Sequence, residues 1–158
     1  MDAGTIQTFD PSSDAASFRD ALGTFVTGPV AIVANSFASV SLAPPMVLWS
    51  PAKSSKRFEH FAGARRFAVH VLSADQRDIC TAIIASKTAI SKVPMHLSHC
   101  GMPIIEGALA TFECNLEATH DAGDHVIVVG EVIRMACDES APKPILYYRG
   151  QYAEIADS

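Results

Sequence analysis

The sequence predicts a single, mainly β domain with short α-helices, in which antiparallel strands close into a small barrel. Residues 109–117 alternate strictly between apolar and polar side chains, and a second strand-like run over 125–133 follows the turn residues 121–124. Together these segments predict a long antiparallel hairpin. No G-x-G-x-x-G sequence follows any strand-like run, which disfavours a Rossmann dinucleotide fold. With 158 residues, 49% of them hydrophobic, the chain is long enough for one core.

The N-terminal part is predicted to contain a tail, a helix and two strands. Residues 1–13 are polar and interrupted by proline, so we expect a frayed tail before a single domain over residues 14–158. Strands are predicted from Pro29 to Val33 and from Met46 to Ser50. Before them, an amphipathic helix is expected to end near Gly28, because apolar residues recur at helical spacing at Phe18, Ala21, Leu22 and Phe25.

A short helix is predicted after the second of these strands. Ser54 or Ser55 can cap its N-terminus, since a serine hydroxyl accepts a backbone N–H that the first turn leaves unpaired. Phe58 and Phe61 share one face of this helix and are expected to point inward. Gly63 is the predicted C-terminal stop.

The next segments are predicted to form a strand, a helix and a loop. Residues 66–72 have the composition of a strand, and Ser73 and Gln76 then have the spacing of a capping box. The helix that they begin is expected to run to about Ala85. Residues 87–103 show little periodicity, so we expect a surface loop there.

The C-terminal half is predicted to be strand-rich. In the first strand of the long hairpin, the alternation places four side chains inward: Ala110, Phe112, Cys114 and Leu116. A last strand over 145–148 continues into residues 149–152.

The composition argues against nucleic-acid and membrane partners. The formal net charge is −5, and no run of basic residues is longer than the Arg65-Arg66 pair. No apolar run approaches the roughly 20 residues needed to cross a bilayer, and the N-terminus lacks an apolar signal segment. We therefore expect a cytoplasmic protein whose partners are small molecules or other proteins.

The cysteines are scattered without a close pair, so a reducing compartment would keep them as thiols. Cys114 lies in the alternating strand and is expected to fill the core. His96, His99 and Cys100 have a short spacing that suits a zinc ion, but no second His/Cys cluster supplies the remaining ligands at standard spacing. We therefore predict no metal site.

The most informative segment is NSFASVSLAPPMVLWS, residues 35–50. It places one asparagine and three serines among small apolar residues and then reaches a proline pair, so it can present backbone N–H groups and hydroxyls to a flat polar ligand. Lys53, Ser54 and Ser55 follow and supply an ammonium group and two hydroxyls, which is the chemistry that a phosphate needs. A polar ring and a phosphate together indicate flavin mononucleotide (FMN).

The string NSFASVSLAPPMVLWSPAKSS closely resembles the signature of the short-chain flavin reductases, the reductase partners of two-component flavin monooxygenases. Weaker matches occur in the family's order at residues 18–28, 66–72, 123–125 and 148–152. The resemblance implies the FMN-binding split β-barrel fold. It also implies contacts to the isoalloxazine ring and ribityl chain, partly through backbone groups, from Asn35, Ser36, Ser39, Val40 and Ser41. The same resemblance implies that Lys53, Ser54 and Ser55 bind the phosphate.

One segment departs from the family pattern. Family members usually place a strand, a turn and a return strand between the TG of the 18–28 match and the NSF at 35–37, whereas here only Gly28 to Ala34 are available for them. Such a segment, at about 3.3 Å per residue, can make one strand but not two joined by a turn. Either the hairpin is deleted or the chain lacks residues that its gene encodes. A true deletion would remove part of the barrel wall and put flavin affinity in doubt.

The leading hypothesis from these residues is an NAD(P)H-dependent flavin reductase that uses FMN, or FAD, and passes reduced flavin to a separate monooxygenase. The flavin performs the redox chemistry in such an enzyme and the protein supplies position, which agrees with the absence of a G-x-S-x-G elbow or paired-carboxylate motif. The alternatives are a non-catalytic flavin-binding protein of the same fold and a degenerate member that has lost flavin binding. The sequence leaves the choice between NADH and NADPH open.

Two further residues are candidate site residues: His125 as the catalytic residue and Arg149 as a cofactor-binding residue. His125 begins a strand directly after a turn, so we expect it at a barrel rim where it can place the nicotinamide or the flavin edge, the alternative being a merely exposed histidine. Arg149 can hold a phosphate or stack on a ring, the alternative being an ion pair at a strand end. His70 is expected to be buried, and Trp49 to pack in the core.

The size and composition also predict a homodimer with its flavin sites near the subunit interface. A small barrel has a high ratio of surface to volume, and this chain holds more apolar side chains than such a barrel readily buries. Two-fold assemblies are the commonest solution.

Overall fold

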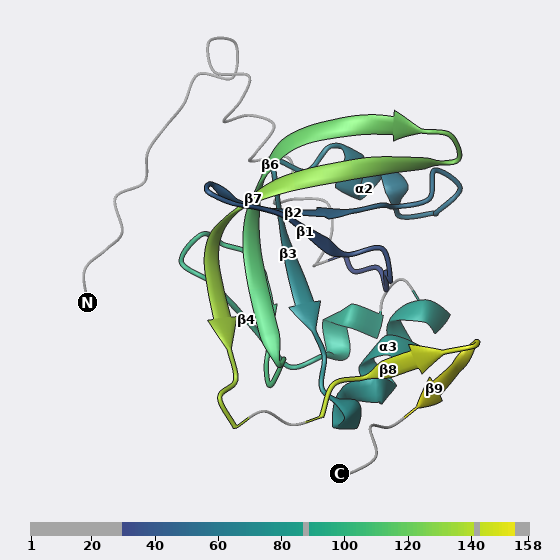
Figure 1. The fold of residues 1–158 in the computed structure, drawn as a ribbon. Coiled ribbons are helices and arrows are strands. Elements are labelled where there is room, and N and C mark those ends of the chain that lie inside the picture. The colour runs from purple at the N-terminus through teal and green to yellow at the C-terminus, as the bar shows by residue number, and fades with distance from the viewer. Residues whose placement is uncertain (1–29, 87–88, 141–142, 154–158) are drawn as a thin grey trace, which may run out of the picture.

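The computed structural model describes residues 30–86, 89–140 and 143–153, so the predicted tail over 1–13 and the predicted helix over 18–28 lie outside the described residues. The described part is mainly antiparallel β-structure with short helices, as predicted. Its main sheet has five strands in the order β1-β2-β7-β6-β3 (Figure 1). Within the described residues β1 and β3 form the two edges of this sheet. These five strands by themselves therefore do not close into the barrel that the sequence pattern predicted.

The serine-rich segment forms an edge strand. β1 (Ala38–Leu42) and β2 (Pro45–Trp49) make an antiparallel hairpin, and the proline pair lies at its turn. The strand predicted over Pro29–Val33 is not formed: within the described residues 30–34 no residue joins a β-ladder. Apolar composition favours an extended chain, but a strand also needs a neighbour that pairs with its backbone N–H and C=O groups.

The long hairpin is confirmed and extends further than the alternation predicted. β6 (Ala110–Ala122) pairs with β7 (His125–Cys137), and the register shifts between Glu113 and Cys114 and between Leu116 and Ala118. Such irregularities bend a strand pair and increase its twist. The hairpin accordingly arches over the rest of the sheet, and its turn projects beyond the other strands (Figure 1).

Both faces of β6 are covered near its start. Cys114 lies in the main core with Phe112 and Leu116 packed against it, as predicted, but Thr111 and Glu113 on the opposite face are also buried. β5 (Pro103–Ile105) contacts the adjoining strand β3 (Arg66–Val71), and the backbone N–H of Ile105 donates to His70 Nε2 at 3.2 Å. His70 is partly buried, where the sequence predicted a buried side chain, and a backbone donor holds its imidazole.

The short helix begins later than predicted. α2 spans Phe58–Ala62, its N-cap is Arg57, and that position makes no side-chain cap hydrogen bond. The prediction that Ser54 or Ser55 caps the helix is therefore wrong. Residues 52–58 instead form two consecutive turns, in which Ser55 N–H donates to Ala52 O and Phe58 N–H donates to Ser55 O. The predicted stop at Gly63 is confirmed.

The next helical segment agrees with the prediction. The Ser73–Gln76 capping box is present, and the backbone N–H of Ser73 donates to Gln76 Oε1 at 3.2 Å. A 3₁₀ turn, η1 (Ala74–Gln76), leads directly into α3 (Arg77–Ala85).

The prediction of a surface loop over residues 87–103 is wrong. Its described part contains a 3₁₀ turn, η2 (Ala89–Lys92), and the strand β4 (Met95–Leu97), which pairs with β5. Ile90 and Val93 are buried in a second core cluster with Ile83 and Ile105. These apolar residues are spaced irregularly, so their burial leaves no periodic signal in the sequence.

The C-terminal hairpin packs beside α3. β8 (Leu146–Tyr148) and β9 (Gln151–Ala153) are antiparallel, and the guanidinium of Arg77 in α3 lies 4.1 Å from the centroid of the Tyr152 ring. Figure 1 shows this hairpin on the same side of the molecule as α3, at the opposite end from the β6–β7 turn.

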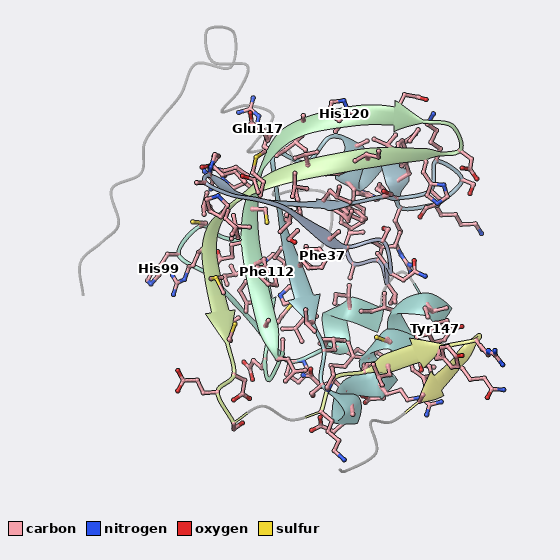
Figure 2. The ribbon with its side chains drawn as sticks, viewed as in Figure 1. Phe37, His99, Phe112, Glu117, His120 and Tyr147 are labelled. Carbon is pink, nitrogen blue, oxygen red and sulfur yellow. The ribbon has the colours of Figure 1, made fainter. Side chains whose placement is uncertain are left out.

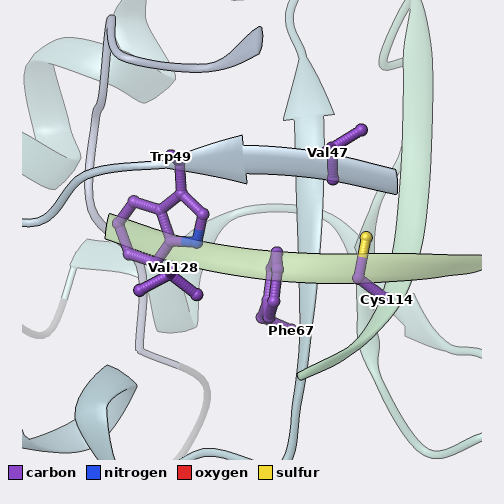
Figure 3. Close-up of a cluster of buried hydrophobic side chains, with 5 residues drawn as sticks. All are labelled: Val47, Trp49, Phe67, Cys114 and Val128. Carbon is purple, nitrogen blue, oxygen red and sulfur yellow. The ribbon is translucent and has the colours of Figure 1, made fainter. Parts of the chain in front are cut away.

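The main core joins four strands of the large sheet. Five side chains form its buried centre: Val47, Trp49, Phe67, Cys114 and Val128 (Figure 3). Burial raises the pKa of the Cys114 thiol to about 11, so this group stays protonated at neutral pH. Its assignment as a core-filling thiol is confirmed.

No helix among the described residues is long and apolar enough to cross a bilayer.

Candidate functional site

Backbone pairing brings two distant predicted motifs together at one end of the sheet. The segment that follows β2 lies against the β6–β7 turn: Lys53 N–H donates to Asp124 O at 2.9 Å, and Val126 N–H donates to Pro51 O at 3.1 Å. A β-bridge also joins Ala52 to His125. The predicted phosphate-binding residues and the predicted nicotinamide-contacting histidine are therefore neighbours. We refer to residues 51–55 and 121–126 together as the rim.

The Lys53 side chain is anchored on the β6–β7 turn. Its Nζ donates to Asp121 Oδ2 at 2.5 Å and to the carbonyl oxygen of Gly123 at 2.6 Å. The Lys53 hydrogen bond, together with the backbone N–H of Gly123 and the charge of Lys53, lowers the pKa of the Asp121 carboxyl. The side chain of Lys53 is 36% exposed.

His125 is paired with the residue that precedes it. Its Nδ1 lies 2.8 Å from Asp124 Oδ1, and this hydrogen bond lowers the pKa of the Asp124 carboxyl. The contact orients the imidazole and directs Nε2 away from the carboxylate. The His125 side chain is 43% exposed, which agrees with the predicted position at a rim.

Ser54 and Ser55 lie beside Lys53 in the turns before α2. Ser54 is exposed, and the Ser55 hydroxyl accepts the Arg57 N–H at 3.3 Å and keeps its own proton available for donation. A small hollow of about 410 Å³ is lined by Ser55, Lys56, Arg57, Ile84 and Ala85. Lys53 and Ser54 do not line this hollow, and none of these three residues lies at the start of α2.

β1 is an irregular strand at one edge of the main sheet. Ser39 pairs with Val47 and Ser41 pairs with Met46, so Val40 is an extra residue, a β-bulge, between them. A bulged residue leaves the regular ladder, and its backbone groups become available to other partners. Ser39 and Val40 are exposed, with Val40 at 50%.

The start of the serine-rich segment is hydrogen-bonded to Ser50, the residue that follows β2. Ser36 Oγ accepts the Ser50 N–H at 2.8 Å and lies 3.3 Å from Ser50 O, to which it donates. This hydroxyl therefore has a structural role that the sequence did not reveal. Ser41 Oγ accepts the Ala43 N–H at 3.3 Å, and Asn35 is exposed.

A larger hollow of about 1520 Å³ lies between residues 30–37, β3, α3 and the β8–β9 hairpin. Asn35 is the one predicted site residue that lines it. Phe37, which also lines it, points toward Phe112, with 5.5 Å between the ring centroids (Figure 2). Trp49 belongs to both the hollow and the core, and its buried Nε1–H has no hydrogen-bond partner within the described residues.

Arg149 is not part of the rim. It lies in the β8–β9 turn with a left-handed backbone (φ 51°) next to Gly150 (φ 80°), and its guanidinium is 5.3 Å from the Tyr148 ring centroid. Figure 1 shows this hairpin beside α3, whereas the rim lies at the β6–β7 turn.

The donors of the rim and of β1 fit a flavin nucleotide. The ammonium of Lys53 and the hydroxyls of Ser54 and Ser55, which follow it in the chain, are donor groups of the kind that a phosphate needs, and a bulged strand edge suits the polar edge of the flavin ring. The described residues contain no group of three or more His, Cys, Asp or Glu side chains that could hold a metal ion. His99 and His120, labelled in Figure 2, are both exposed.

The fold and this arrangement define the class of protein. The family model for the flavin reductase like domain matches residues 21–156, so the chain belongs to that family. Among its relatives, the FMN reductase (NADH) SmoA of Agrobacterium fabrum is 48% identical over 137 residues, which cover 80% of this chain and 79% of SmoA. HsaB of Mycobacterium tuberculosis, the reductase subunit of a flavin-dependent monooxygenase, is 37% identical over 156 residues, which cover 90% of this chain and 83% of HsaB.

A solved structure supports the same family fold. The NADH:FAD oxidoreductase SgcE6 of Streptomyces globisporus, solved with NAD and FAD fragments, superposes with a TM-score of 0.76 at 31% identity. The match covers 96% of this chain and 98% of SgcE6. The prediction of a flavin reductase fold from the sequence is confirmed.

Proposed function

We propose that this flavin reductase binds FMN at the rim and β1, reduces it with NADH or NADPH, and passes the reduced flavin to a separate monooxygenase. The observation that supports the proposal is the β-bridge between Ala52 and His125, because it makes Lys53 and His125 neighbours although they are far apart in the sequence. The flavin supplies the redox chemistry when bound, by accepting a hydride from the nicotinamide.

Lys53, Ser54 and Ser55 are assigned to the flavin phosphate. An ammonium group makes charge-assisted hydrogen bonds to phosphate oxygens, and the serine hydroxyls donate to the remaining ones. Asn35, Ser36, Ser39, Val40 and Ser41 are assigned to the ring and ribityl chain. For Val40 the relevant groups are those of its bulged backbone.

His125 and Arg149 are assigned to the nicotinamide substrate. The contact with Asp124 fixes the His125 imidazole, so its Nε2 can position the nicotinamide over a seated flavin. Arg149 would bind a phosphate of the same nucleotide or stack on one of its rings. Because Arg149 lies on a different hairpin, this role requires the dinucleotide to extend from the rim toward the β8–β9 turn.

The relatives support a partner oxygenase and a nicotinamide donor. HsaB is named as the reductase subunit of a flavin-dependent monooxygenase, SmoA as an FMN reductase that uses NADH, and SgcE6 was solved with NAD and FAD fragments. By analogy, we assign this chain a monooxygenase partner, with FMN as the first choice of flavin and FAD as the second.

A homodimer is part of the proposal. Val40 and Leu42 on the edge strand β1 are 50% and 92% exposed, so the edge of the sheet presents apolar side chains that a second subunit would cover.

An anaerobic titration tests the proposed activity. The protein is mixed with FMN and then with NADH or NADPH, and the visible absorbance of oxidised flavin is followed. We expect bleaching that depends on both the protein and the nicotinamide. Flavin that binds but is not bleached would indicate a non-catalytic flavin-binding protein, and unaltered flavin fluorescence on titration would indicate a chain that no longer binds flavin.

A further inference from the structure

The ammonium of Lys53 already has an anionic partner. Asp121 and the carbonyl of Gly123 both accept hydrogen bonds from it, so a phosphate that approaches Lys53 must replace or share the Asp121 carboxylate. The two side chains differ in exposure, 36% for Lys53 and 78% for Asp121. The carboxylate is therefore the more hydrated of the two, and rotation of its side chain would turn it into solvent.

A second carboxylate adds to the negative charge at the same turn. Asp124 is 93% exposed and pairs with His125. Hydrogen bonds lower the pKa of both Asp121 and Asp124, so both carry a negative charge at neutral pH. A phosphate at Lys53 thus meets repulsion from the turn as well as attraction from the ammonium.

The side-chain pair is not needed to hold the rim together. The bonds from Lys53 N–H to Asp124 O and from Val126 N–H to Pro51 O already join the two segments, together with the bridge from Ala52 to His125. Exposed ion pairs add little to the stability of a fold. The Lys53–Asp121 contact therefore has a consequence for binding rather than for folding.

We propose that Asp121 is a specificity-determining residue that competes with the flavin phosphate for Lys53 and so weakens the binding of FMN. This inference rests on the proposed function. Asp121 acts through Lys53 and does not itself contact the flavin. Its effect is a faster release of phosphorylated flavin, which suits a reductase that hands its product to another protein.

The test compares Asp121→Asn with the unaltered protein by titrating FMN and, separately, riboflavin, which has the same ring without the phosphate. We expect FMN to bind about 3- to 10-fold more tightly to the variant, because a carboxylate that neutralises Lys53 is removed, and riboflavin affinity to stay the same. The gain should shrink as salt is raised, since screening weakens exposed charge interactions. Asp121→Glu should keep the affinity of the unaltered protein.

Asp138→Asn is the matched control. It removes the same charge from an exposed aspartate just beyond the far end of β7, where Asp138 bonds to Ser140. We expect it to leave FMN affinity unchanged, which excludes a general effect of net charge.

Two results would overturn the inference while leaving the flavin site intact: an unchanged ratio of FMN to riboflavin affinity in Asp121→Asn, or an equal loss of both affinities together with a lower melting temperature. The second result would mean that the Lys53–Asp121 contact stabilises the fold. Riboflavin bound as tightly as FMN by both the unaltered protein and Asp121→Asn would instead overturn the phosphate assignment itself, and the inference with it.

Discussion

The Phe67 ring lies directly against Gly130. A Cβ atom built at Gly130 would lie 2.5 Å from Phe67 Cζ and 3.0 Å from Cys114 Cβ, so the β7 backbone approaches the core more closely than any other residue type allows. Phe67 also contacts Trp49, with 6.1 Å between the ring centroids. Gly130 therefore permits the packing that joins β3, β6 and β7 beneath the rim.

Gly130→Ala should destabilise the protein by about 1–3 kcal/mol, because the added methyl group would overlap the Phe67 ring and press on Cys114 Cβ, so the Phe67 side chain must shift. Urea unfolding, read as a change in midpoint at constant slope, measures the effect. Gly63→Ala is the control, since the nearest atom to its new Cβ would be Glu59 O at 3.6 Å. A Gly130→Ala variant as stable as Gly63→Ala would contradict this account of the core.

The stability of the fold should depend on pH through His70. Burial lowers the pKa of this imidazole from 6.5 to about 4, although the charge of Glu113 partly opposes the shift. The unfolded chain takes up the proton below about pH 6.5 and the folded chain only near pH 4, so His70 favours unfolding as the pH falls through this window. The loss should reach about 3 kcal/mol.

Unfolding free energies of the unaltered protein and of His70→Gln, measured at several pH values, isolate this contribution from that of the carboxylates. A glutamine oxygen can replace Nε2 as acceptor for Ile105 N–H but does not titrate. We expect the variant to lose less stability between pH 6.5 and 4. Parallel curves for the two proteins would mean that His70 is protonated in the folded state.

Lys53→Ala should weaken FMN binding by about 1–3 kcal/mol, the usual contribution of a charge-assisted hydrogen bond to a phosphate. Fluorescence titration with FMN and with riboflavin measures it, and riboflavin affinity should not change. If the variant binds FMN as tightly as the unaltered protein, Lys53 has no role beyond its contacts with Asp121 and Gly123.

His125→Ala should lower the rate of hydride transfer more than it lowers flavin affinity, because the imidazole is assigned to the nicotinamide after the flavin is seated. Stopped-flow reduction of bound FMN at saturating NADH and NADPH separates the two effects. An unaltered reduction rate would leave His125 as an exposed turn residue.

The protein should sediment as a homodimer at micromolar concentration, and FMN should shift the equilibrium further toward the dimer, because a ligand stabilises the state that binds it. Sedimentation with and without FMN tests this expectation. A single-chain species that binds flavin fully would contradict it.

Local patterns predicted the elements that depend on neighbouring residues. The alternation of residues 109–117 and the turn at 121–124 were sufficient for the β6–β7 hairpin, and the spacing of Ser73 and Gln76 was sufficient for the start of the helix that leads into α3. The prediction of a surface loop over residues 87–103 was wrong because the burial of residues 89–105 depends on contacts with α3 and β3. The prediction of a helix cap at Ser54 or Ser55 was wrong because the sequence did not reveal the turns before α2.

For the candidate site, the sequence by itself determined which donors are present: an ammonium, hydroxyls and a histidine in an order that resembles the flavin reductases. Only the tertiary structure decided how they are arranged. Lys53 and Asp121 are 68 residues apart, and they meet because the end of β2 pairs with the β6–β7 turn. The bulge at Val40 likewise depends on how β1 pairs with β2, because Ser39 and Ser41 pair with adjacent residues of β2 and leave Val40 unpaired. Pairing between distant segments has no local signal in the chain. The sequence therefore shows which donor groups are present, but not which residues they contact.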